Sequence, residues 1–189
     1  MAKIFTPIKF SAKLMRPGGA DKGASWAFLN LPLEVSQELP TRSMVSVEGS
    51  FNAHPFQATL DPDGQGGHWL KVEPALQKST GTKVGDEIEL EIAPATKEPE
   101  PVVPQDIQAA LASAPPKVME TWLATTAIAR RDWIKWITSG KKEETRLKRI
   151  EVACSKLGAG NKRPCCFDRS GMYDKSLSCP IADLEEEEA

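Results

Sequence analysis

Two adjacent cysteines are the residues of this chain whose types and spacing come closest to nucleophilic chemistry. Cys165 and Cys166 lie between Arg163 and Arg169, and a nearby guanidinium lowers the pKa of a thiol and so favours the reactive thiolate. This arrangement is typical of a thiol-based redox or small-molecule enzyme. The alternative is structural, because free cysteines are among the most frequently buried residues. The sequence therefore leaves open whether the protein is an enzyme.

Metal and cofactor chemistry finds little support in the spacing of potential ligands. The cysteines lack the CxxC pairs of a zinc site, and the two histidines, His54 and His68, lie far from them in the sequence. His68, beside Trp69, is expected on a strand surface. The glycine-rich stretch 61–67 lacks the spacing of a phosphate-binding loop and predicts a hairpin tip. We expect neither a cofactor nor a metal.

Basic side chains form the second group of candidates. Residues 101–163 carry 12 basic and 6 acidic side chains, a net charge of +6, whereas the segments before and after them are net acidic. Lysine and arginine can neutralise the carboxylates or phosphates of an anionic partner. The candidate binding residues are Arg130, Arg131, Lys135, Lys141, Lys142, Thr145, Arg146 and Arg149.

The arrangement of these cations argues against nucleic acid as the partner. On a helix over residues 128–139, Trp133 and Trp136 fall on one side, and the basic residues fall toward the other. Surfaces that bind single-stranded nucleic acid place rings and cations on the same exposed face. The separation favours an amphipathic helix with buried tryptophans and solvated cations. An unknown ligand or protein partner, of anionic character, is expected, with nucleic acid as the alternative.

The elements that must position these residues fall into two groups. Before residue 94, short runs of alternating apolar and polar residues are separated by turn residues, which is typical of antiparallel strands. About six such strands predict a small antiparallel β-barrel over residues 1–93. A turn is expected at 49–52, and a short helix is expected after Pro32.

Helical periodicity dominates the second half of the chain. Residues 94–104 contain four prolines and predict an extended linker. Apolar spacings of three and four over 106–113, 116–126, 126–140 and 143–160 predict three to four helices. We expect a helical module over 105–180, including the cysteine-containing segment, and a solvated acidic tail over 181–189. The fold class is α+β.

The chain has no apolar run of the length that a signal peptide or a membrane span requires. We therefore expect a cytoplasmic protein without a membrane span.

One set of residues in the second half carries a family resemblance. The set consists of Pro104, Asp106, Ala109, Ala110, Leu111, Trp136, Ile137, Lys141, Thr145, Arg146, Arg149 and Ile150. In type and spacing it resembles the helical module called bacteriocin-protection, YdeI or OmpD-associated, although Gly140 stands where that module has alanine. The first half is similar to the small β-barrel domain of unknown function that often precedes this module.

The resemblance implies a bacterial stress-tolerance protein that protects against bacteriocins or antimicrobial peptides. The family has no established catalytic residues, so the resemblance implies a non-catalytic protein that acts by binding.

Overall fold

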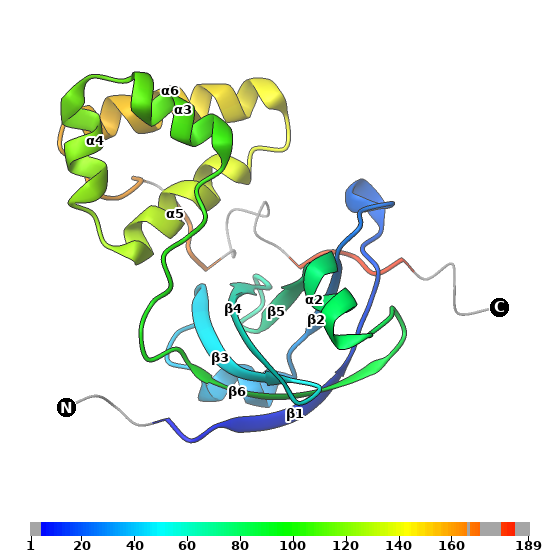
Figure 1. The fold of residues 1–189 in the computed structure, drawn as a ribbon. Coiled ribbons are helices and arrows are strands. Elements are labelled where there is room, and N and C mark those ends of the chain that lie inside the picture. The colour runs from blue at the N-terminus through cyan, green and yellow to red at the C-terminus, as the bar shows by residue number, and fades with distance from the viewer. Residues whose placement is uncertain (1–4, 166, 171–178, 184–189) are drawn as a thin grey trace. The chain divides into compact units, whose positions relative to one another are not determined.

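The computed structural model of the protein describes residues 5–165, 167–170 and 179–183. The chain forms two compact units (Figure 1), the first made of residues 1–96 with 169–189 and the second of residues 97–168. Each unit has its own hydrophobic core. The α+β class expected from the sequence is confirmed.

The first unit is a six-stranded antiparallel half-barrel. The strands are β1 (Ile8–Lys13), β2 (Ala27–Asn30), β3 (Val45–Phe51), β4 (His54–Pro62), β5 (His68–Val72) and β6 (Glu87–Pro94). They lie side by side in the order β1-β6-β3-β4-β5-β2. Met15, just after β1, exchanges two main-chain hydrogen bonds of 2.8 and 2.9 Å with Phe28 on β2, which joins the two outer strands at one point.

Alternation along the strands produces the core of this unit. On β6, Ile88, Leu90 and Ile92 are at most 3% exposed, while Glu87 and Glu89 point to solvent. Successive side chains of a strand point to opposite faces, so the pattern IELEI puts all its apolar residues on the inner face. The hairpin tip predicted over residues 61–67 connects β4 to β5.

The turn between β3 and β4 differs from the expectation. Asn52 and Ala53 occupy its centre with φ of 46° and 63°, the pair of positive values that a tight type I′ hairpin requires. Gly49 lies within β3, where a Cβ would overlap the carbonyl oxygen of Glu91. Glycine is therefore needed there for close backbone approach and not for a turn.

The described residues of the first unit also form the short helical segments η1 (Gly19–Asp21), α1 (Leu33–Glu38) and α2 (Pro74–Thr80). The sequence predicted α1, and α2 was missed. Pro74 begins α2, and Gly81 ends it with a left-handed φ of 68°. A proline at the first position and a glycine just past the last are typical of a helix, and this pair of residues could have predicted α2.

The second unit contains four helices, α3 (Gln105–Ser113), α4 (Pro116–Leu123), α5 (Ala127–Thr138) and α6 (Glu143–Gly158). They confirm the helices predicted from periodicity. Helix α6 packs against the other three (Figure 1). Trp133, Ile137 and Leu157 are each 1% exposed at the centre of the core.

The unit boundaries differ from those expected. Residues 97–104, assigned to a linker, belong to the compact helical unit. Residues 179–183 belong to the first unit, because the amide of Gly18 donates to the carbonyl of Ile181 at 2.7 Å and the amide of Asp183 donates to the carbonyl of Arg16 at 2.9 Å. The helical module therefore does not extend to residue 180. Most of the predicted acidic tail, residues 184–189, lies outside the described residues.

Candidate functional site

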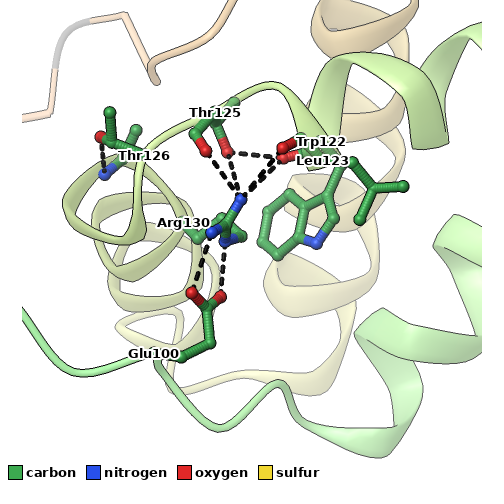
Figure 2. Close-up of polar contacts among 7 residues, drawn as sticks. Glu100, Trp122, Leu123, Thr125, Thr126 and Arg130 are labelled. Atoms are coloured by element: carbon green, nitrogen blue, oxygen red, sulfur yellow. Dashed lines mark hydrogen bonds and ion pairs between the residues drawn. The ribbon is translucent and has the colours of Figure 1, made fainter.

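Arg130 lies at the centre of a polar cluster at the start of α5 (Figure 2). Its Nε and Nη2 atoms donate to the two carboxylate oxygens of Glu100, at 2.5 and 2.8 Å. Its Nη1 atom donates to the carbonyls of Thr125 and Trp122, at 2.7 and 3.2 Å. Arg130 therefore caps the C-terminal end of α4, where carbonyls lack helical partners, and also holds the segment before α3.

The start of α5 is set by its own capping residue. The hydroxyl oxygen of Thr126 accepts a hydrogen bond from the amide of Ala129 at 3.2 Å, as Figure 2 shows. An N-cap threonine satisfies one of the amide groups that have no partner within the helix. This cap fixes the first residue of α5. Arg130 and Arg131, in the first turns of the helix, face residues 97–104, which precede α3.

Arg131 makes the neighbouring contact with that segment. Its guanidinium pairs with the carboxylate of Glu98, and the side chain of Arg131 is only 12% exposed. Glu98 and Glu100 are two residues apart, a spacing that puts side chains on the same side of an extended chain. Two consecutive arginines of α5 therefore meet two carboxylates of residues 97–104.

Arg146 connects α6 to α3. Its guanidinium donates to both carboxylate oxygens of Asp106, at 2.6 and 3.0 Å. These hydrogen bonds, and secondarily the attraction between the opposite charges, lower the pKa of the Asp106 carboxyl and raise the pKa of the Arg146 guanidinium, because they stabilise the charged form of each group. Asp106 also lies in the first turn of α3, where a carboxylate interacts favourably with the helix dipole.

Arg149 caps the C-terminal end of α5. Its Nη1 atom donates to the carbonyl of Trp136 at 2.5 Å and to the hydroxyl of Ser139 at 2.7 Å. The guanidinium also lies 5.4 Å from the ring centre of Trp136, a cation–π distance. Trp136 is half-buried under this contact and Trp133 is buried, which leaves little aromatic surface on which a base could stack.

The other predicted binding residues lie around the junction of α5 and α6. Lys135 is half-buried on α5, and Lys141 and Lys142 are exposed just before α6. Thr145 is half-buried, and its methyl group lies 3.1 Å from the position that a Cβ on Gly140 would take. The eight candidates therefore divide into two groups of four: the arginines, which join segments of the helical unit, and the residues around this junction.

Comparison with known families places both halves of the chain. A family model described as a domain of unknown function (DUF1905) matches residues 10–92, and a model described as bacteriocin-protection, YdeI or OmpD-associated matches residues 100–160. The chain is a DUF1905 domain followed by a bacteriocin-protection, YdeI or OmpD-associated domain. We call the second the OmpD-associated domain. No curated protein matches the chain.

The match to the OmpD-associated domain begins at Glu100 and contains its partner Arg130. Sequence reasoning missed this acidic side of the site. The sequence analysis assigned Glu98 and Glu100 to a linker. Their spacing of two residues puts both carboxylates on one side of an extended chain, and this could have suggested a match to the two consecutive arginines of α5.

Two of the cysteines are unsuited to thiolate chemistry. Burial raises the pKa of Cys154, on α6 of the OmpD-associated domain. Burial, and secondarily the charge of Asp63, raises the pKa of Cys179 to about 12. Both thiols are therefore protonated at neutral pH. Cys165 is exposed, and Cys166 lies outside the described residues. Within the described part of the chain, His, Cys, Asp and Glu form no cluster of three or more that could hold a metal.

His68 of the DUF1905 domain was expected on a strand surface, and this is wrong. Its side chain is 1% exposed, its Nε2 atom lies 3.0 Å from the carbonyl of Ser43, and its amide donates to the hydroxyl of Ser36. Burial lowers the pKa of His68. The error came from assuming that β5 has one solvated face, whereas His68, Trp69 and Leu70 are all buried.

None of the helices in the described ranges has the length and apolar character needed to cross a membrane.

Proposed function

We propose that the protein is a non-catalytic binding protein that gives bacteria tolerance to bacteriocins or other antimicrobial peptides. The observation that carries this proposal is the match of residues 100–160 to a family named for bacteriocin protection. Three arginines of that segment, Arg130, Arg146 and Arg149, hold helices together, which assigns these candidates a structural role within the binding module. As part of the same proposal the protein acts in the cytoplasm.

In this proposal the ligand is anionic and meets the junction of α5 and α6. Support comes from Lys141 and Lys142, which are exposed immediately before the first turn of α6. Glu143 and Glu144 occupy the first turn of α6 and already interact with the amide groups at its N-terminus, so the proposed attraction for an anion rests on the two lysines. Thr145 and Lys135 border the junction, and the internally paired Arg130, Arg131, Arg146 and Arg149 order the helices around it.

A binding titration tests the ligand class. We expect fluorescently labelled polyglutamate to bind the full-length protein at low salt and to dissociate as ionic strength rises, because contacts between exposed charges are screened. The variant K141Q/K142Q should bind at least several-fold more weakly. The control K117Q removes an exposed lysine that pairs with Glu120 on α4, and it should bind like the wild type. Absence of binding at low salt would contradict the proposal.

The same titration examines the nucleic-acid alternative. A single-stranded oligonucleotide of matched charge should bind no more tightly than polyglutamate, because the rings of Trp133 and Trp136 lie within the helical packing. Stronger binding of the oligonucleotide would favour nucleic acid as the partner.

Cell survival tests the biological role. A strain that lacks the protein should die at a lower bacteriocin concentration than its parent. Expression of the wild type should restore tolerance, and K141Q/K142Q should restore it only in part. Equal survival with and without the protein, across several bacteriocins, would refute the proposed role.

One observation favours a second function, a thiol-based redox or small-molecule enzyme. Cys165 is exposed, unlike Cys154 and Cys179, and Arg163 is close to it in sequence. Alkylation rates of the native protein measured against pH, with site assignment by mass spectrometry, test this alternative. A thiolate at Cys165 or Cys166 that reacts well below the ordinary thiol pKa of about 8.5 would support it. Reaction only near that value would remove it.

A further inference from the structure

Residues 97–104 lead from the half-barrel to α3, and their proline content predicts an extended linker. We propose instead that two ion pairs latch this segment onto the helical unit. The chain crosses between the two units at residues 96–97 and again at 168–169, and at the first of these crossings the latch confines the joint to Lys97. We call the pairs Glu98–Arg131 and Glu100–Arg130 the latch. The inference concerns the connection between the units and does not depend on the proposed function.

On the first side of Lys97, the chain is fixed to the half-barrel. The amide of Ala95 donates to the carbonyl of Ser46 at 2.8 Å, and the amide of Thr96 donates to the carboxylate of Glu48 at 3.2 Å. Both acceptors belong to β3, the neighbour of β6 in the sheet. The hydrogen-bonded part of the chain therefore continues past the end of β6, up to Thr96.

On the other side of Lys97, the latch begins at once. With their carboxylate partners in place, the side chains of Arg130 and Arg131 are 15% and 12% exposed. Arg130 is also held by the carbonyls at the end of α4. The guanidinium of Arg130 is therefore held in place independently of Glu100, so pairing between the two costs little additional conformational entropy.

The rest of the segment is fixed between the latch and α3. Pro99 and Pro101 flank Glu100 and restrict the backbone to an extended form. The carbonyl of Val103 accepts a hydrogen bond from the side chain of Gln108 at 2.9 Å, and Val103 packs against the helical core. Between Thr96 and Glu98, only Lys97 is left without such a restraint from either unit.

The two pairs of the latch differ in exposure. The side chain of Glu100 is 60% exposed and that of Glu98 is 21% exposed. Water and salt therefore compete more effectively for Glu100. The latch can open from the Glu100 side without disturbing the core of the unit, and opening would extend the joint from Lys97 into the following residues.

Backbone order parameters from ¹⁵N relaxation of the full-length protein test the latch. The measurement needs an amide proton at each position, and all the residues to be compared have one: Ala95, Thr96, Lys97, Glu98 and Glu100. We expect order parameters of about 0.85 at Glu98 and Glu100, as in the helices, and a minimum at Lys97. In the variant E98Q/E100Q, which keeps the shape of both side chains, the values at positions 98 and 100 should fall below about 0.6.

The matched control is E120Q, which removes the carboxylate of an exposed ion pair with Lys117 on α4. It should leave residues 95–103 unchanged, and unchanged amide shifts in the helices would show that both variants are folded. Order parameters below about 0.6 at Glu98 and Glu100 in the wild type would overturn the latch. Unchanged values in E98Q/E100Q would overturn the role of the ion pairs, and a Lys97 as ordered as its neighbours would overturn the position of the joint.

Discussion

His68 is a buried titratable side chain that becomes costly to keep inside when the pH falls. Desolvation is the main cause that lowers its pKa below 6.5, and the carbonyl of Ser43 and the charges of Asp63 and Asp61 act in the opposite direction. The Nδ1 atom has no hydrogen-bond partner among the described residues. A neutral imidazole that donates from Nε2 to Ser43 fits this environment, because an unpaired buried acceptor costs less than a buried charge.

The sign of the pH dependence follows from this lowered pKa. Below pH 6.5 the unfolded chain binds a proton at His68 that the folded protein takes up only at lower pH. The stabilising contribution is therefore present above that pH and is lost as the pH falls. We expect the free energy of unfolding of the first unit to decrease below pH 6.5, by up to about 1.4 kcal/mol per pH unit.

Urea unfolding followed by the amide signals of β5 checks this prediction. The variant H68Q should lose the dependence between about pH 7 and pH 5, a range that brackets the ordinary histidine pKa. H54Q removes the other histidine, which is exposed, and should retain it. Equal slopes in H68Q and the wild type would assign the effect to other groups.

At the scale of elements, arginine side chains hold the helical unit together at several junctions. Arg130 caps α4, Arg149 caps α5, and Arg146 joins α6 to α3. Sequence periodicity predicts the helices, because their apolar faces repeat locally. It does not predict these junctions, because each depends on which residues of different helices come together.

The Arg146–Asp106 pair offers a quantitative test of a junction. In a double-mutant cycle with R146Q and D106N, we expect a coupling energy of about 0.5–1 kcal/mol, the upper range for a partly exposed pair with two parallel hydrogen bonds. Thermal or urea unfolding of the four proteins supplies the measurement. The cycle K117Q/E120Q on α4, an exposed pair at 3.4 Å, should give less. A coupling near zero for Arg146–Asp106 would mean that α3 is held by its apolar contacts alone.

At the scale of the whole molecule, two separate cores predict two separate unfolding events. Leu70 in the half-barrel and Ile137 in the helical unit are each 1% exposed, and replacing such a residue with alanine costs about 2–5 kcal/mol. In calorimetry, L70A should lower the temperature of one transition and I137A that of the other. A single transition lowered by both variants would show that the units unfold together.

Both core variants could also be too unstable to purify. In that case the milder substitutions V47A in β3 and I137V in α5 make the same comparison with a smaller loss of unfolding free energy. Both residues are at most 1% exposed.

Much of the fold was available from the sequence. The alternation in β6 and the spacing of Ile150 and Leu157 on α6 predict strand and helix, because burial on one face repeats with the period of the element. The Asp-Pro-Asp-Gly stretch predicts a hairpin because proline and glycine restrict the backbone locally. The family resemblance was also available, because it was carried by residue types and their spacing along residues 104–150.

Only the tertiary structure decided what the charged residues do. Arg130 and Glu100 are 30 residues apart, and Arg146 and Asp106 are 40 apart, so their pairing depends on the packing of whole helices. The same holds for His68, which is buried because residues near Ser36 and Ser43 lie against it. Local pattern determined which elements form, whereas long-range packing determined which polar groups meet, because a charge has no periodicity that identifies its partner.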